Sequence, residues 1–302
     1  MGKISDQLNS IITHNQDGVD KLNAIFRQIR DEDLPIVRHT IFAGSSFIRQ
    51  RINIPKRNFC HISELSYPPI SLTSMGRANL PGHPMFYACS FPSEINAEAP
   101  IPRLVALEET SSFLKDKSKS GIERATVSRW RVVEQIELIA LPYIGKYERA
   151  CLDLKRIKEG WIDAISKGKV PEDPLELVNY MAEEISKDFV DKEQYFKIAN
   201  FVNYLLTSNL KTKDADGIIY PSVPAKGAGF NVAIKPEVID RKVRFENASI
   251  CHFLKNGENM FVMSMSDAEV DEYGNIVFVD RILSEDMLSL YNKKSYGLSF
   301  IN

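Results

Sequence analysis

The chain has 302 residues, of which 44% are hydrophobic and 26% are charged, and this composition is typical of folded globular proteins. It excludes a disordered or fibrous protein, and the length is sufficient to bury a core without disulfides or metals. The 38 basic and 40 acidic side chains give a formal net charge of -2, which disfavours nucleic acid or an anionic membrane as the main partner.

The cysteines and the N-terminal residues indicate a cytoplasmic protein. Cys60, Cys89, Cys151 and Cys251 lie far apart without a CxxC pair, as expected for reduced thiols. The first residues lack a basic stretch followed by an apolar core, so we expect no signal peptide. No window approaches the roughly 20 apolar residues that span a bilayer, so no membrane segment is expected.

The first third of the chain predicts helices and then short strands. Residues 4 to 29 carry apolar side chains at helical spacing, interrupted around 15 to 18, which predicts a helical N-terminal extension over residues 1 to 40. Residues 42 to 54 are expected to include a strand. The prolines, glycines and serines of residues 55 to 102 favour turns and short strands.

A helical segment is predicted in the middle of the chain, after a strand or strand pair in residues 127 to 141. Asp173, Pro174 and Glu176 form a capping box at the start of one predicted helix. Helical spacing repeats in a second helix, so the helical middle extends over about residues 145 to 212.

Strands return in the last third. A turn is expected at 214 to 217, followed by short strands at 218 to 220 and 230 to 234. Residues 250 to 265 predict a hairpin around Asn-Gly, and residues 274 to 280 a final strand. Strands on both sides of a helical middle predict an α+β fold.

Common local signals for metal and nucleotide chemistry do not occur in the sequence. The five histidines never lie at i and i+4 with a carboxylate, so no metal site is expected. Lys226 to Gly229 lacks the spacing of a phosphate-binding loop. No GxSxG motif is present.

Three separate segments carry the candidate site residues. The first is a glycine and proline turn, Gly76-Arg77-Ala-Asn79, that leads into a short apolar strand containing Tyr87. The second is an apolar run that ends at Glu108 and Glu109. The third contains Asp216-Gly-Ile-Ile-Tyr-Pro-Ser222 and is followed by Asn231.

In this order the segments resemble the RES family, which is named for an arginine, a glutamate and a serine, over about residues 49 to 234. The resemblance implies a mixed β-sheet core like that of ADP-ribosyltransferases over residues 41 to 302, with the helical middle as an insert. It implies a toxin-like enzyme that consumes NAD+ by cleaving its nicotinamide N-glycosidic bond, as a glycohydrolase or a phosphorylase. NAD+ is then the substrate, and no prosthetic group is implied.

The resemblance also implies roles for individual residues. The implied catalytic set is Arg77, Glu109 or Glu108, and Ser222. The implied NAD+ contacts are Arg77, Tyr87, Ser222 and Asn231, with Arg49 or Arg51 as a further contact on the phosphate side. Glu109 is favoured because it keeps Ala106-Leu107 in the register of the family, while Glu94 and Glu98 stay open as alternatives.

The chemistry of the reaction fits these residue types. Loss of neutral nicotinamide leaves positive charge on the ribose, which a carboxylate stabilises. Arginine offers paired donors for the diphosphate, and the Tyr87 ring can stack on the nicotinamide. Ser222 can bond the ribose hydroxyls or the carboxamide, since no histidine base accompanies it in the sequence.

Two other functions stay open on the sequence alone. One is a protein ADP-ribosyltransferase, and the other is a non-catalytic module that binds NAD or ADP-ribose. The resemblance to toxins adds a neutralising antitoxin protein as a partner to test for.

Overall fold

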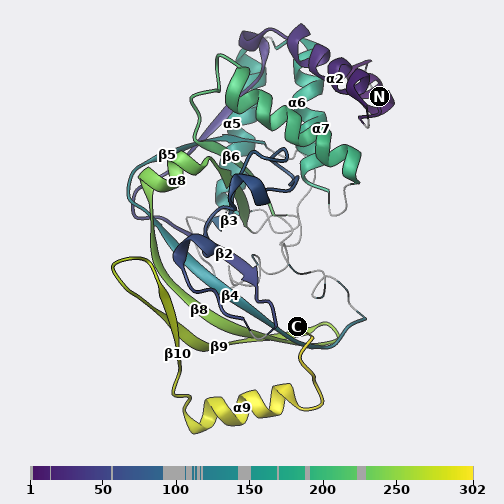
Figure 1. Cartoon of the computed structure of the whole chain (residues 1–302). Helices are drawn as coiled ribbons and strands as arrows, with labels where there is room; N and C mark the ends of the chain where they lie inside the picture. Colours follow the sequence, from purple (N-terminus) through teal and green to yellow (C-terminus); the bar gives the residue numbers. More distant parts are fainter. Residues whose placement is uncertain are drawn as a thin grey trace.

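The computed structural model describes residues 3–13, 15–55, 57–90, 118–141, 151–168, 170–187, 191–222 and 229–301, together with Ala106, Ser111, Phe113 and Asp116. This part of the chain is α+β, as predicted. Figure 1 shows a long curved sheet with the helices α2, α5, α6 and α7 gathered at one end and α9 at the other. Among the described residues, no helix has the length and apolar character needed to cross a membrane.

The described strands lie on both sides of the helical middle in the sequence. They are β1 (Val37–Ile41), β2 (Ser46–Ile52), β3 (Phe86–Ser90), β4 (Gly121–Val132), β5 (Ile136–Ala140), β6 (Gly217–Pro221), β7 (Phe230–Ile234), β8 (Val243–Asn256), β9 (Asn259–Val270) and β10 (Ile276–Asp280). The helices are α1 (Lys3–Ser10), α2 (Gln16–Gln28), α5 (Leu152–Gly168), α6 (Glu172–Ile185), α7 (Lys192–Asn203), α8 (Pro236–Lys242) and α9 (Glu285–Ser295).

All ten described strands belong to one sheet, in the order β1-β5-β6-β7-β3-β2-β4-β8-β9-β10. Within the described residues β5 and β6 run parallel, and the other neighbours are antiparallel. The contact between β3 and β2 in the middle of the sheet is short, since only Phe47–Ser90 and Ile48–Cys89 are paired. The sheet therefore opens between β2 and β3 beyond Ile48.

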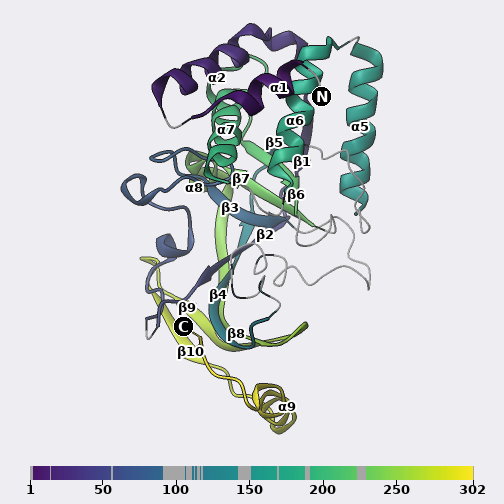
Figure 2. The same cartoon turned by 90° about the vertical axis from the view of Figure 1, so that its right-hand side faces the viewer.

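The N-terminal helices share a hydrophobic core with the helical middle. Leu8, Leu22 and Phe26 are buried in the same cluster as Met181 and Phe201. Figure 2 shows α1 and α2 lying across α6 and α7. The chain thus builds its helical layer from two segments that are far apart in the sequence.

The predicted capping box at the start of α6 is wrong. The helix begins at Glu172, one residue before Asp173, and Pro171 at its N-cap position makes no side-chain bond. The Glu176 carboxylate instead accepts the backbone N–H groups of Ile4 at 3.1 Å and Ser5 at 2.8 Å. These two N–H groups lie at the N-terminus of α1 and have no partner within that helix. Glu176 therefore caps α1 through a tertiary contact and does not cap its own helix.

Asp216 and Gly217 are fixed by the closure of the sheet. The Asp216 Oδ2 atom accepts the Glu137 N–H at 2.8 Å and lies 2.6 Å from Lys242 Nζ. A Cβ atom at Gly217 would lie 2.2 Å from the Ala233 carbonyl oxygen, so only glycine allows β6 and β7 to approach. The predicted turn therefore ends at Asp216, and Gly217 already belongs to β6. Asp216 and Gly217 thus fix the position of β6, the strand that leads to Ser222.

The predicted hairpin around Asn256-Gly257 is confirmed, and its strands β8 and β9 are much longer than expected. The residues after β10 return to the sheet, where Ile122 pairs with Phe300 beside β4. His252 anchors this return. Its Nδ1 atom lies 2.9 Å from the Tyr291 hydroxyl, and its ring meets the Phe300 ring edge-on at 5.0 Å.

Acid is expected to weaken this anchor. Burial, and then repulsion by Arg124, lower the pKa of His252 to about 4. In the unfolded chain this imidazole has a pKa of about 6.5, so it takes up a proton at a higher pH than in the folded chain. The free energy of unfolding should fall as the pH drops from 7 toward 5, and His252→Gln should make that fall smaller.

Urea unfolding at several pH values measures this effect, with His83→Gln at an exposed histidine as the control. Equal pH dependence in wild type and His252→Gln would contradict the assignment.

Candidate functional site

A cavity of about 430 Å³ lies where β2 and β3 separate. It collects side chains from β2, β3, β6 and β7, from the turn before β3 and from α7. Its polar lining includes Arg49, Gln50, Arg77, Tyr87, Tyr220 and Asn231. Segments that are far apart in the sequence thus contribute to one cavity.

Arg49 is a half-buried cation in this opening, and none of the described carboxylates forms an ion pair with it. Its guanidinium donates to the Tyr87 carbonyl oxygen and lies 5.3 Å from the centre of the Phe86 ring. Its Nε atom is buried without a hydrogen-bond partner in the described part of the chain. Burial, and then repulsion by Arg51, lower the pKa of Arg49 to about 10, so the side chain is still charged at neutral pH. A half-buried cation that no described carboxylate neutralises favours an anionic ligand.

The turn before β3 is closed by the Tyr87 hydroxyl. This oxygen accepts the Ala78 N–H at 2.9 Å and donates to Asn79 Oδ1 at 2.7 Å. A Cβ atom at Gly76 would lie 2.4 Å from Asn79 Oδ1 and 2.7 Å from the hydroxyl, so the turn requires glycine there. Burial raises the pKa of Tyr87 well above its ordinary value, which keeps the phenol neutral and able to donate.

Arg77 joins this turn to the helical layer. Its Nη1 atom donates to the Ile185 and Lys187 carbonyl oxygens at the C-terminal end of α6, the second at 2.9 Å. Its guanidinium also lies 5.7 Å from the centre of the Tyr195 ring. The negative end of a helix suits a cation. Arg77 therefore lines the cavity while part of its donor set positions α6.

The opposite wall comes from β6, β7 and the inner part of β3. Tyr220 and Asn231 are cross-strand partners, and Asn231 in turn faces Cys89, whose Sγ atom lies 3.3 Å from Asn231 Oδ1. Ser222 is fully buried just after β6 and donates its backbone N–H to the Gly229 carbonyl at 2.9 Å. It does not belong to the described lining of this cavity, although Tyr220 two positions earlier does.

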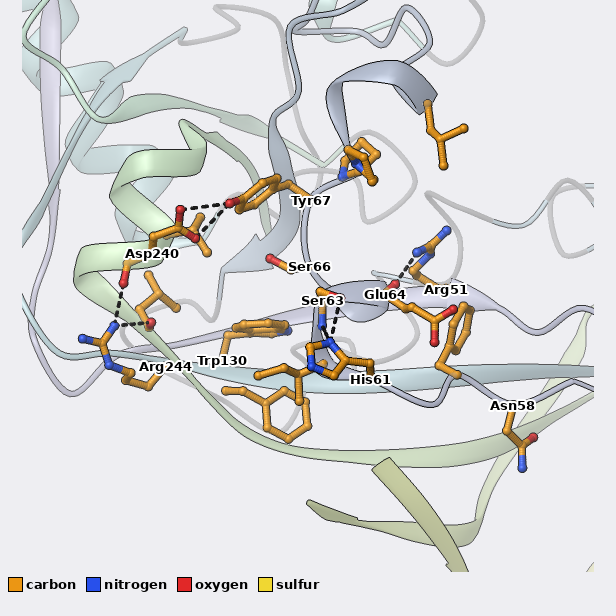
Figure 3. Close-up of a pocket in the computed structure, with 18 of the residues that line it drawn as sticks. Arg51, Asn58, His61, Ser63, Glu64, Ser66, Tyr67, Trp130, Asp240 and Arg244 are labelled. Atoms are coloured by element: carbon orange, nitrogen blue, oxygen red, sulfur yellow. Dashed lines mark hydrogen bonds between the residues drawn. The ribbon is translucent and has the colours of Figure 1, made fainter. Parts of the chain in front are cut away.

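Arg51 lies in a different cavity, of about 860 Å³. Figure 3 shows this space. At one end Arg51 donates a hydrogen bond to the Glu64 carbonyl oxygen, and at the other the Tyr67 hydroxyl donates to the Asp240 carboxylate. Trp130 also lines the cavity. The Arg51 guanidinium also lies 5.0 Å from the centre of the Phe59 ring. The structure thus separates the two arginines that the sequence predicted to share one role.

The predicted acids lie outside the described residues. This holds for Glu108 and Glu109 and for the alternatives Glu94 and Glu98. Ala106, two positions before Glu108 in the sequence, lines the cavity. Within the described lining no side chain is acidic, and no described cluster of three His, Cys, Asp or Glu side chains can hold a metal ion.

Gln50 is a cavity residue that motif reasoning missed. It lies between Arg49 and Arg51 on β2, and it shares the apolar face of Ile48 and Ile52. A polar side chain in an alternating apolar row was the available signal, because residues at i and i+2 face the same side of a strand.

Comparison with known proteins gives no assignment. The chain matches no protein-family model, and no curated protein matches it.

The bonds of the Tyr87 hydroxyl should contribute measurably to stability. Tyr87→Phe leaves the Ala78 N–H and the Asn79 Oδ1 atom without their shared partner, and we expect a loss of about 1–3 kcal/mol in the free energy of unfolding. Tyr67→Phe is the matched control, since its hydroxyl bonds the Asp240 carboxylate near solvent and its loss should cost under about 1 kcal/mol. Urea unfolding compares them. Equal losses would show that the turn does not depend on Tyr87.

Proposed function

We propose that the protein is an NAD+-consuming enzyme that cleaves the nicotinamide N-glycosidic bond, as a glycohydrolase or a phosphorylase. The proposal includes the RES resemblance of the sequence and an ADP-ribosyltransferase-like arrangement of the core. It assigns substrate binding to the cavity between β2 and β3.

The observation that carries the proposal is the Arg49 guanidinium, which pairs with no described carboxylate, in a cavity that also holds Arg77, Tyr87 and Asn231. These residues were selected as NAD+ contacts from the sequence, and they lie on separate segments. A dinucleotide supplies the anion that Arg49 lacks, because its diphosphate carries negative charge and several acceptor oxygens.

The cavity also suits the aromatic part of the substrate. Tyr87, Tyr195 and Tyr220 line it, and the hydroxyl of the first is held by the turn. A flat cationic ring stacks favourably on such faces. Arg49 then binds the diphosphate, and Arg77 keeps α6 and the Tyr195 ring in place.

The reaction breaks the bond between the ribose C1′ atom and the ring nitrogen. Its electron pair leaves with the nitrogen as neutral nicotinamide, and the ribose carries an oxocarbenium-like positive charge. Water or phosphate then bonds to C1′, and water releases one proton in doing so. A carboxylate lowers the energy of the charged sugar, and we assign this role to Glu109, with Glu108 as the alternative.

A second function uses the same cavity. A non-catalytic module that binds NAD or ADP-ribose would need the anion contact of Arg49 and no catalytic acid. Such a module would bind NAD+ tightly and return it intact.

Nicotinamide release from NAD+ tests the proposal. Purified protein should release nicotinamide with water, phosphate or cell extract as the source of the acceptor. ADP-ribose identifies water, its 1-phosphate identifies phosphate, and labelled protein identifies an ADP-ribosyltransferase. Absence of release under all three conditions contradicts the enzyme, and intact NAD+ recovered from a tight complex favours the binding module.

Arg49 and Arg51 allow a matched comparison on one strand. Arg49→Lys removes a forked cation from the cavity, and we expect kcat/KM for NAD+ to fall by about tenfold or more, in line with the energy of a charge-assisted hydrogen bond. Arg51→Lys, in the other cavity, should change it by less than about threefold. Thermal unfolding of both variants controls for folding. Equal kinetic effects would place the substrate elsewhere.

A further inference from the structure

Gln50 has a buried amide without a partner in the described part of the chain. The side chain is 4% exposed and lines the cavity between β2 and β3. Neither its Nε2 nor its Oε1 atom has a hydrogen-bond partner among the residues that the structure describes. Both a donor and an acceptor are therefore available at the wall of the cavity.

The surroundings of Gln50 give no structural reason for an amide. Ile48, Ile52, Ala125 and Val127 lie around it in one apolar cluster, and Val127 is its cross-strand partner on β4. A leucine or methionine would fit this row without losing a hydrogen bond. Buried amides without partners are rare because they lose their bonds to water, so this position points to a ligand.

Gln50 and Arg49 reach the cavity from opposite faces of β2, since successive side chains of a strand alternate. The ligand therefore has an anionic part at Arg49 and a neutral polar part at Gln50. A carboxylate cannot satisfy the amide, because it accepts hydrogen bonds and has no donor for Oε1. A planar group with a donor beside an acceptor satisfies both atoms.

We propose that Gln50 is a specificity-determining residue that forms a paired hydrogen bond with a planar group of this kind on the bound dinucleotide. The proposal rests on the proposed function. NAD+ presents the required pair in two places, the nicotinamide carboxamide and the amino edge of adenine, and glutamine pairs with adenine in this way in nucleic acids. Either group offers Nε2 an acceptor and Oε1 a donor.

Calorimetric binding of NAD+ and two analogues tests the pairing. Nicotinic acid adenine dinucleotide replaces the carboxamide by an acid, and nicotinamide hypoxanthine dinucleotide replaces the amino group of adenine by a carbonyl. Wild type should bind one analogue at least about tenfold more weakly than NAD+, because a buried polar group is left unpaired. The disfavoured analogue identifies the end of NAD+ that Gln50 contacts.

Gln50→Leu should remove this preference, and it should raise the thermal unfolding midpoint of the ligand-free protein. Gln135→Leu, at an exposed glutamine, is the matched control and should change neither. A lower midpoint for Gln50→Leu would show a structural role and overturn the proposal. An unchanged preference in that variant, or no preference in wild type, would also overturn it.

Failure of the proposed function gives a different result. If no dinucleotide binds, free nicotinamide against nicotinate and adenosine against inosine test the same pairing in wild type and Gln50→Leu. A preference for nicotinamide or adenosine that is lost in Gln50→Leu supports the paired hydrogen bond. It excludes only the dinucleotide as the ligand. Binding of none of these compounds overturns both proposals, and NAD+ cleavage without any Gln50 effect overturns only this one.

Discussion

The candidate site depends on the opening of the sheet between β2 and β3. The two strands pair at Phe47–Ser90 and Ile48–Cys89 and then separate, so part of β3 has no β2 partner. Arg49 lies at this point and bonds the Tyr87 carbonyl oxygen in place of a strand neighbour. Beyond Ile48 the Arg49 guanidinium thus links β2 to β3 where the two strands have no described backbone pair. A half-buried charge that no described carboxylate neutralises is costly unless an anion binds.

The motif residues around this opening combine structural and binding roles. Gly76 and Gly217 are required by close contacts, the first with the Tyr87 hydroxyl and the second with the Ala233 carbonyl. Arg77 bonds the end of α6, so it links the helical layer to the cavity. These contacts fix the shape of the walls, whereas Arg49 and Gln50 keep polar atoms available inside. The division explains why the unpaired atoms of Arg49 and Gln50 are retained at this cavity: functional sites often lower stability locally.

Local sequence patterns predicted the elements that a short stretch of sequence specifies. Apolar spacing indicated α2, α6 and α7, and Asn256-Gly257 marked the hairpin of β8 and β9. The capping box failed because the Glu176 carboxylate accepts a hydrogen bond from Ser5 in α1, which is 171 positions away in the sequence. The parting of β2 and β3 depends on strand register, which no single segment encodes. For that reason the sequence grouped Arg49 with Arg51, and only the fold separates them into two cavities.

A crystal structure with bound ADP-ribose is the most direct measurement of the central claim. We predict that the nucleotide lies in the opening between β2 and β3, with a diphosphate oxygen within hydrogen-bond distance of the Arg49 guanidinium. A nucleotide bound beside Arg51 and Trp130, or any bound pose that leaves Arg49 without an anionic partner, would contradict it.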